Sequence, residues 1–338
     1  MNAKSQRASR WQILLLRHET ILLLVVALEW IYFDVVGQRF GTVDNTFEIV
    51  RHSVEIGLLA LVMTPIILTG GIDLSVGSLL GLCAILFGKL WRDGGLSPLN
   101  AGFCTLVIGG CAGGLNAGLI TRLKLPPLIV TLGTYSLFRG LAEAITHGVD
   151  TFTNFPDSFL FFGQERWLGV PAQLPIFLVI AIAIWLMVHR TVLGRSFRAI
   201  GFAPEGARYA AIPVNRRIGF LYVLAGVISA LSAIIYTARL GQAKADAGSG
   251  YELFAITAVV LGGTNIFGGV GSVHGTLLGV AAIAILDNGL VHARQPREVA
   301  GMLTGALLIV ALSSSALPQL VAFLRARRKE TQPLRESP

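Results

Sequence analysis

A polar, glycine-containing run at Thr69–Ser78 separates two long apolar stretches, Ile56–Leu68 and Leu79–Phe87. It holds the carboxylate of Asp73 and the hydroxyl of Ser75. Hydrocarbon does not tolerate exposed polar backbone or charge. Such a run is accepted at membrane depth only where protein buries it or where it lines a water-filled path. The pattern therefore favours a transport function.

Asp73 has two compatible roles in this setting, and the sequence leaves both open. Its carboxylate could cap a helix that begins at Leu74 by accepting backbone N–H bonds. It could also line a path for a polar substrate, because ionisable groups within membrane spans mark such paths. The sequence lacks the chains of acidic residues that a proton-driven carrier uses, which disfavours secondary transport by this chain alone.

Arg139 and Glu143 are two further charges within an apolar stretch. Residues four positions apart share one face of a helix, so we expect these two side chains to pair. A charge at the bilayer centre costs about 2.5–3.5 kcal/mol on insertion scales, and pairing offsets part of that cost. Glu55 and Asp287 are the other main acidic residues within predicted spans.

Motifs for ATP binding and hydrolysis are missing from the sequence. A P-loop requires Gly-x4-Gly-Lys-Ser/Thr. The Gly88-Lys89 pair is followed by Leu90, and Cys83 occupies the position of the first glycine. Hydrolase signatures such as His-Glu-x-x-His and Gly-x-Ser-x-Gly do not occur either. The cysteines lie in apolar stretches without zinc-site spacing, so we expect no metal site and read them as small packing residues: Cys83, Cys104 and Cys111.

The composition places the chain among polytopic membrane proteins. Of its 338 residues, 54% are hydrophobic and 14% are charged, and the mean hydropathy is +0.69. Soluble domains are about 25% charged. A spanning helix needs about 20 mostly apolar residues. We therefore predict an all-α fold of about ten transmembrane helices, some broken or short: Thr20–Val36, Ile49–Leu68, Leu74–Leu90, Leu99–Ile120, Leu128–Ile145, Leu174–Val188, Ile218–Ala238, Leu253–Leu261, Gly275–Leu290 and Ala300–Leu317.

The distribution of Lys and Arg predicts that both termini are cytoplasmic. An even number of spans places both ends on one side, and the positive-inside rule then selects the cytoplasm. This explains the formal charge of +8 without a nucleic-acid partner. The predicted cytoplasmic cations are Lys4, Arg7, Arg10, Arg17, Arg122, Lys124, Arg190, Arg195, Arg198, Arg208, Arg216, Arg217, Arg325, Arg327, Arg328, Lys329 and Arg335.

The predicted organisation is one permease domain at 20–317, between a cytoplasmic N-terminus at 1–19 and a cytoplasmic tail at 318–338. Its longest outer loop is 146–173 and its longest inner loop is 189–217. Glycines also recur at four-residue spacing, a pattern that lets helices approach closely. They form predicted packing faces at Gly110, Gly114 and Gly118, at Gly271, Gly275 and Gly279, and at Gly301 and Gly305.

The inner loop contains a predicted short helix. Pro204 suits the first helical position, Glu205 complements the positive end of the helix dipole, and Pro213 follows the helix. Tyr209 and Ile212 are then available for docking against a partner. The alternative is a basic amphipathic surface loop.

Several long motifs together resemble the ribose-type permeases of bacterial ABC sugar importers, within the branched-chain amino acid/sugar permease family. They run in order from about Ile49 to Leu312. The motifs are Thr69-Gly-Gly-Ile-Asp-Leu-Ser-Val-Gly-Ser78, Leu125-Pro-Pro-Leu-Ile-Val-Thr-Leu-Gly-Thr134 with Arg139-Gly140, Arg190-Thr-x-x-Gly-Arg195, Gly250-Tyr-Glu-Leu-x-Ala-Ile-x-Ala-Val-Val-Leu-Gly-Gly-Thr264, Gly268-Gly269, Gly275-Thr276 and Asn288-Gly289-Leu290.

This resemblance implies a transport subunit of the bacterial inner membrane, not an enzyme. The partners it implies are a second permease subunit in the bilayer, a periplasmic sugar-binding protein, and an ATPase chain with two nucleotide-binding domains. That ATPase would bind the ATP and Mg²⁺, so no cofactor is expected in this chain. Its motion would reach the membrane through the inner-loop helix, at Glu205, Gly206, Ala207, Arg208, Ala211 and Ile212.

The resemblance also implies a substrate path between two permease subunits. The polar residues expected to line it are Asp73, Ser75, Asn116, Thr131, Thr134, Asn265 and Asn288. The expected substrate is a monosaccharide of the pentose or deoxyhexose class. A sugar-like autoinducer and a branched-chain amino acid are the alternatives within the same class of protein. An ion-coupled secondary carrier, or a membrane scaffold or enzyme, would be a different class.

The sequence departs from the family pattern at the inner-loop helix. Ala203 replaces the usual Asn cap, Gly206 replaces an Ala, and Ala211 replaces a Gly. These changes predict weaker capping and a dedicated ATPase partner. Phe254 and Val270 also differ from the usual residues, which leaves the sugar undetermined.

Overall fold

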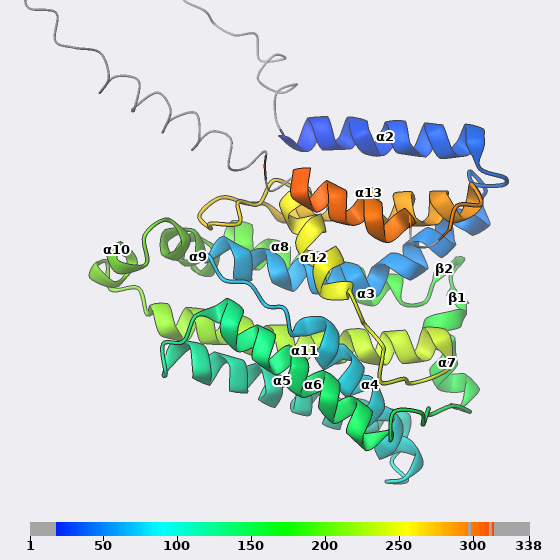
Figure 1. The fold of residues 1–338 in the computed structure, drawn as a ribbon, viewed down its shortest axis with the longest axis horizontal. Coiled ribbons are helices and arrows are strands. Elements are labelled where there is room, and N and C mark those ends of the chain that lie inside the picture. The colour runs from blue at the N-terminus through cyan, green and yellow to red at the C-terminus, as the bar shows by residue number, and fades with distance from the viewer. Residues whose placement is uncertain (1–17, 297–298, 311–312, 314–338) are drawn as a thin grey trace, which may run out of the picture.

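The computed structural model describes residues 18–296, 299–310 and 313, and within them the apolar stretches form helices (Figure 1). One short hairpin provides the two strands of the described part. The elements are α2 (His18–Val36), α3 (Val43–Leu68), α4 (Val76–Arg92), α5 (Pro98–Thr121), α6 (Pro127–Ile145), α7 (Asp157–Gln164), β1 (Arg166–Trp167), β2 (Val170–Pro171), α8 (Leu174–Arg190), α9 (Val192–Phe202), α10 (Pro204–Tyr209), α11 (Val214–Leu240), α12 (Tyr251–Leu261), α13 (Val273–His292) and an unlabelled helix, Val299–Val310.

The helical fold agrees with the prediction, but fewer helices than ten meet the length and hydropathy of a membrane span. Five described helices do, and the pair α8 and α9, bent by 65°, makes a sixth if it counts as one span. Helix α4 has 17 residues and α12 has 11, so each is too short to cross a bilayer unaided. The count of ten and the cytoplasmic termini stay predictions. Most of 1–19 and all of 318–338 lie outside the described residues.

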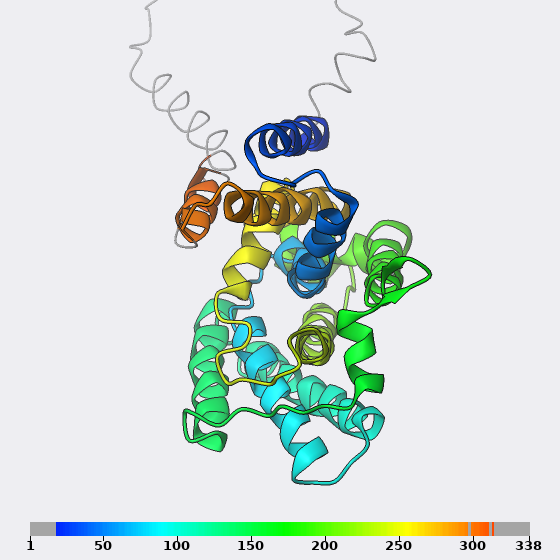
Figure 2. The same cartoon turned by 90° about the vertical axis from the view of Figure 1, so that its right-hand side faces the viewer.

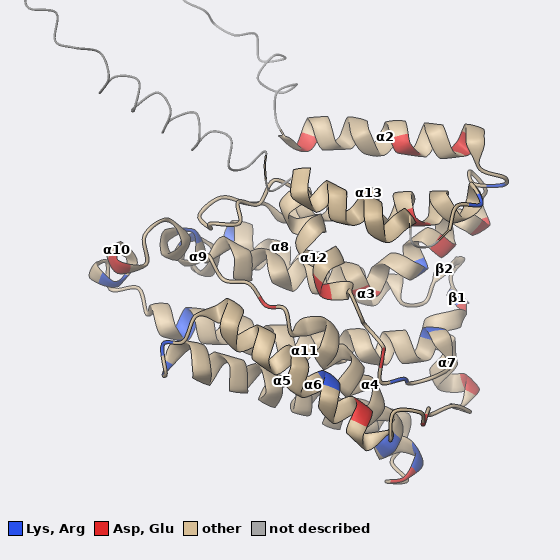
Figure 3. Ribbon diagram, viewed as in Figure 1, with Lys and Arg blue, Asp and Glu red and all other residues tan. Residues whose placement is uncertain are grey.

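The helices lie mostly along the long axis of the molecule, and the loops gather at its two ends (Figure 1). We call these the α10 end, which carries α9 and α10, and the α7 end, which carries α7 and the β1–β2 hairpin. The predicted inner loop 189–217 is at the α10 end and the predicted outer loop 146–173 is at the α7 end. Lys and Arg lie mainly toward these ends, with few charges along the helices between them (Figure 3).

Helix α3 forms the centre of the core. Every residue from 57 to 69 is buried, which is typical of a helix that is apolar all round. Helix α11 packs on α3, α4 and α5, while α2 is outermost and packs on α13 (Figure 2). Helices α5 and α6 instead expose large apolar side chains such as Phe103 and Ile129, as expected where a helix faces lipid.

Close packing of α5 on α11 depends on Gly109 and Gly113, a pair at four-residue spacing one position before the predicted one. A Cβ on Gly109 would lie 2.5 Å from the Gly226 carbonyl oxygen, and a Cβ on Gly113 would overlap the Tyr222 carbonyl oxygen. Gly114 and Gly118 have no neighbour within 4 Å of such an atom, so the predicted face through them is wrong. The cause is rotation about the helix axis, because α5 carries glycine on several faces: Gly109 and Gly113 meet the α11 backbone, Gly110 meets only the Val227 side chain, and Gly114 and Gly118 face away.

Candidate functional site

Two helices begin inside the body of the molecule instead of at its ends. A first segment, residues 69–75, leads from the end of α3 into α4. A second segment, residues 241–250, leads from the end of α11 into α12 (Figure 1). The two starts meet, because a Cβ on Gly77 would overlap the Glu252 Oε2 atom and lie 2.5 Å from the Gly248 carbonyl oxygen. Interrupted helices of this kind are typical of transporter binding sites.

The first segment is held by hydrogen bonds among the predicted path residues. Asp73 is 2% exposed, and its Oδ1 accepts from the Ser75 backbone N–H at 2.8 Å and from the Ser75 hydroxyl at 2.6 Å. Asn116 Nδ2 on α5 donates to Ser75 Oγ at 2.9 Å. Helix α4 starts at Val76, two residues later than predicted, with Ser75 at its N-cap. Asp73 therefore fixes the turn that leads into the helix.

Two hydroxyls from other helices bind the backbone of the same segment. Thr131 Oγ1 on α6 donates to the Ile72 carbonyl oxygen at 3.3 Å, and the Tyr222 hydroxyl on α11 donates to the same oxygen at 3.4 Å. Four of the predicted path residues are thus brought together: Asp73, Ser75, Asn116 and Thr131. Sequence reasoning did not select Tyr222, which looks like one more aromatic residue of an apolar helix.

The other three predicted path residues lie elsewhere or bond within their own element. The Thr134 hydroxyl donates to the Val130 carbonyl oxygen of its own helix at 3.1 Å. Asn265 accepts from the Phe267 N–H at 3.0 Å in a turn after α12. Asn288 on α13 exchanges hydrogen bonds with Asn45 on α3, at 2.9 and 3.0 Å. The structure therefore does not join these three to the Asp73 network.

A charged group that sequence reasoning assigned differently lies beside the second segment. Arg139 on α6 donates to the carbonyl oxygens of Ala245 and of Ala247, the latter at 3.1 Å. The expected Arg139–Glu143 pair is wrong, since within the described part of the chain no ion pair includes Glu143. The Arg139 guanidinium instead donates to backbone carbonyl groups of the second segment, because that segment crosses α6.

Glu252, at the start of α12, is a candidate functional residue that lies within the Gly250–Thr264 motif and was not predicted as a site residue. It is 6% exposed, and its Oε2 atom has no hydrogen-bond partner. A buried carboxylate oxygen without a partner is costly, so such groups are uncommon and are associated with sites that bind or move. The available signal was a single acidic residue that opens an otherwise apolar run.

A second buried charge pair lies nearer the α7 end. Arg239 Nε donates to Glu55 Oε1 at 2.7 Å, and the two side chains are 7% and 0% exposed. This pair joins α11 to α3. Its partnership could not be read from the sequence, because the two residues are 184 positions apart. Among the described residues, no group of three or more His, Cys, Asp or Glu side chains is placed to hold a metal ion.

The short helix predicted in the inner loop is present as α10. Its N-cap, Ala203, makes no side-chain bond, as the replacement of Asn predicted. The helix ends with Ala211 at φ +59°, in the left-handed region, and the Ile212 N–H donates to the Ala207 carbonyl oxygen at 3.0 Å. Glycine usually occupies this position of a helix C-terminus, so Ala211 adopts a strained conformation there.

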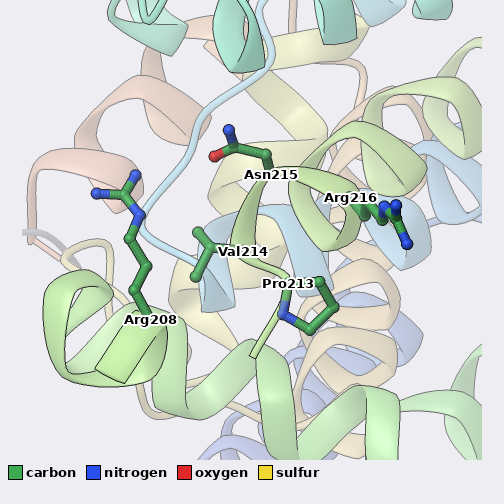
Figure 4. A pocket seen from close by; sticks show the side chains of 5 residues that line it. All are labelled: Arg208, Pro213, Val214, Asn215 and Arg216. Atoms are coloured by element: carbon green, nitrogen blue, oxygen red, sulfur yellow. The ribbon is translucent and has the colours of Figure 1, made fainter. Parts of the chain in front are cut away.

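The outer surface of α10 is charged and aromatic, and its inner surface is anchored. Ala207 is buried against Ile200 and Val214, whereas Tyr209 is 92% exposed. Glu205 and Arg208 form an ion pair on the surface. A cleft of about 310 Å³ lies beside this helix, and Figure 4 shows Arg208 on one side of it and Arg216 on the other. The cleft is lined by Arg208, Pro213, Val214, Asn215 and Arg216.

Helix α9 lies within the inner loop. Its Gly201 packs between the end of α3, at Leu68, and the turn after α12, at Gly269. A Cβ on Gly201 would overlap the Leu68 carbonyl oxygen and the Gly269 nitrogen, so only glycine fits between them. The Gly269 N–H in turn donates to the Leu68 carbonyl oxygen at 2.9 Å. A displacement of α9 would therefore press directly on the end of α3, where the first segment begins.

Comparisons with known proteins show the family of the chain. The model of the family described as branched-chain amino acid transport system / permease component matches residues 45–312. Autoinducer 2 import system permease proteins LsrD from Escherichia coli K12, Shigella flexneri and Escherichia coli O157:H7 are each 40% identical over 297 residues, which cover 86% of this chain and 90% of the relative. None of the solved structures matches.

Proposed function

The chain belongs to the permease component family of branched-chain amino acid transport systems, and we propose that it carries a sugar-like molecule across the bacterial inner membrane. It is a transport subunit of an ABC importer, not an enzyme. The observation that carries the proposal is the 40% identity to autoinducer 2 import permeases along 86% of the chain. The two interrupted helices support it, because such helices build substrate paths in transporters.

The proposed substrate is a sugar-like autoinducer, ahead of the pentose or deoxyhexose that the sequence motifs suggested. The relatives named for autoinducer 2 import support this choice. Ser75, Asn116 and Thr131 are 0–1% exposed and bond to one another or to backbone, so they would bind a neutral hydroxylated molecule after a movement of residues 69–75 exposes them. A branched-chain amino acid is the competing substrate, because the family takes its description from that transport.

The proposed partners supply what this chain lacks. A separate ATPase chain with two nucleotide-binding domains would bind ATP and Mg²⁺. A periplasmic binding protein would deliver the substrate, and a second permease subunit, identical or related, would complete the path. The absence of a P-loop from the sequence supports an external source of energy.

We propose that the ATPase docks on α10 and the cleft beside it. Exposed Tyr209 would enter a pocket of the ATPase, and the arginines at the cleft would face acidic side chains. Anchoring of Ala207 in the protein lets α10 move together with α9. Gly201 then transmits that motion to the end of α3, where residues 69–75 start.

Uptake into lipid vesicles tests the substrate assignment. The importer would be reconstituted from this chain, its second permease subunit, the ATPase and the binding protein, with ATP supplied on the ATPase side. We expect labelled autoinducer 2 to accumulate, and unlabelled ribose to compete weakly. Accumulation of leucine instead, with no competition by either sugar-like compound, would overturn the substrate assignment.

A further inference from the structure

A second cavity lies away from the Asp73 network and from the inner loop. It has a volume of about 550 Å³ and is enclosed by α3, α11, α12, α13 and the helix Val299–Val310. Small-molecule sites occupy roughly 300–1,000 Å³, so this cavity is large enough for one small ligand. It shares no lining residue with the Asp73–Ser75–Asn116 network.

The lining combines an apolar wall with polar side chains that converge from several helices. Phe254, Ile56 and Ile283 contribute to the apolar part. A ligand with one carbon-rich face and several hydroxyls suits such a lining, because the wall contacts the C–H surface while the polar groups bind the hydroxyls. The polar lining side chains are His52, Ser53, Tyr236, Arg239, Tyr251, Asp287, Asn288, whose amide is bonded to Asn45, and Gln295.

Charge in the cavity favours a neutral ligand. The guanidinium of Arg239 already binds the Glu55 carboxylate at 2.7 Å and contacts His52 Nδ1 at 3.0 Å. Its positive charge is therefore compensated by the protein and not reserved for an anion.

We infer that this cavity is a binding site, within a single permease subunit, for a small neutral polyhydroxylated molecule. The inference rests on the proposed function for the choice of ligand class, a sugar or sugar-like compound. It goes beyond that function in placing a ligand inside one subunit, apart from the path between two. The aromatic rings of Tyr236 and Tyr251, 6.3 Å apart in an edge-to-face arrangement, provide the part of the wall nearest the ion pair.

Equilibrium binding to the full-length chain in lipid nanodiscs, without ATPase or binding protein, tests this inference. The probes are radiolabelled ribose and autoinducer 2, with ribose 5-phosphate as the charged competitor. We expect saturable binding of at least one neutral probe, at one site per chain, and no competition by the phosphate. Absence of saturable binding of both probes, or equal competition by ribose 5-phosphate, would overturn the inference.

Two variants locate the site. Ala284 lines the cavity, so Ala284→Leu should fill part of it and weaken binding at least tenfold. The matched control is Ala183→Leu, because Ala183 is exposed on α8 and does not line the cavity. Tyr236→Phe keeps the ring and removes one hydroxyl, and should weaken binding about fivefold while thermal unfolding is unchanged.

The outcomes separate this inference from the proposed function. If Ala284→Leu and Ala183→Leu bind the probe equally well, the cavity is not the site. If that result accompanies normal ATP-driven uptake by the importer, the inference fails and the proposed function stands. If co-purified phospholipid fills the cavity and is lost only from Ala284→Leu, the cavity belongs to lipid and the inference is also overturned.

Discussion

The two segments that lead into α4 and α12 solve the same problem differently. Each returns the chain to the middle of the bundle and begins a short helix there. The first segment carries its own charged group, since Asp73 binds Ser75 two residues away, and the groups that reach it from other helices are neutral: Asn116, Thr131 and Tyr222. The second segment forms backbone turns and receives its charged partner from outside, because Arg139 comes from a helix more than 100 residues earlier. A carboxylate within the first segment fixes its turn, whereas the second relies on a cation from a distant helix.

The acidic residues at the two helix starts, Asp73 before α4 and Glu252 in α12, also differ in their hydrogen bonds. The Oδ1 atom of Asp73 accepts two hydrogen bonds, and Asn116 extends the network to α5. Glu252 keeps a buried Oε2 atom without a partner. A buried, unsatisfied oxygen raises the free energy of its conformation, so a rearrangement that satisfies it is favoured. The second segment is therefore the better candidate for a moving part of the path.

Removal of Arg139 should have the largest effect on folding stability, because it releases the second segment. Arg139→Met removes the donor for two carbonyl oxygens of the second segment, and leaves the carboxylate of Glu252 without a nearby cation. We expect a loss of about 3 kcal/mol of folding free energy, as for other broken buried charge contacts. Thermal unfolding in detergent measures it. Glu143→Gln on the same helix is the control, and an equal loss there would contradict the assignment.

A methyl group at Gly77, where α4 meets α12, should have the next largest effect on stability. The Cβ of Gly77→Ala would overlap Glu252 Oε2, so α4 and α12 must separate. Overpacking of this kind costs about 1–3 kcal/mol. The measurement is the unfolding temperature together with ATP-driven uptake. Gly133→Ala, where no atom lies within 4 Å of the new Cβ, should leave both unchanged. Equal behaviour of the two variants would show that the two helices do not meet there.

A conservative change in the first segment should have a smaller effect. The side chain of Asp73→Asn keeps an oxygen that accepts from the Ser75 N–H and hydroxyl, but it loses the negative charge. We expect a loss of about 1 kcal/mol in folding free energy, the difference between charged and neutral hydrogen bonds. Uptake should fall less than fivefold. Complete loss of uptake in a folded Asp73→Asn variant would instead assign the carboxylate a direct part in transport.

A change outside both segments should have the smallest effect, with the opposite sign. Ala211 lies at φ +59°, so Ala211→Gly relieves strain at the end of α10. Relief of the strain contributes about 1 kcal/mol. The greater conformational entropy of the unfolded chain with glycine offsets most of it, so stability should rise by only a few tenths of a kcal/mol. Differential scanning calorimetry would record the rise, and uptake should be unchanged. Destabilisation would contradict the left-handed conformation.

Much of this architecture follows from the sequence because its signals are local. The apolar stretches predicted the long helices to within a few residues, except for an early start at α3 and the part of the last helix outside the described residues, whereas α7 and α9 were not predicted. Pro204, Glu205 and Pro213 predicted α10, and the Ala203 replacement predicted its uncapped start. The Asp73–Ser75 turn is local too, since a carboxylate readily binds the backbone two residues on.

The long-range contacts could not be predicted in the same way. Arg139 was assigned to Glu143 because helical spacing makes them neighbours, but a loop from residues 245–247 occupies the guanidinium. Gly109 and Gly113 face α11 instead of the predicted glycines, since rotation of α5 depends on all its neighbours. The role of a polar residue in a helix or turn depends on its partner, which the sequence does not show. The partners of Thr134 and Asn265 lie within the same element, and the partner of Asn288 lies on α3.

The central claim is that energy enters through the inner loop and reaches the path through α9. ATP-driven uptake by the reconstituted importer, with residues 205–211 deleted from this chain, tests it most directly. Uptake should stop while the chain remains in the membrane and still assembles with its second permease subunit. Normal uptake by the deletion variant, or uptake by this chain alone under an ion gradient without any ATPase, would show that energy does not enter through the inner loop.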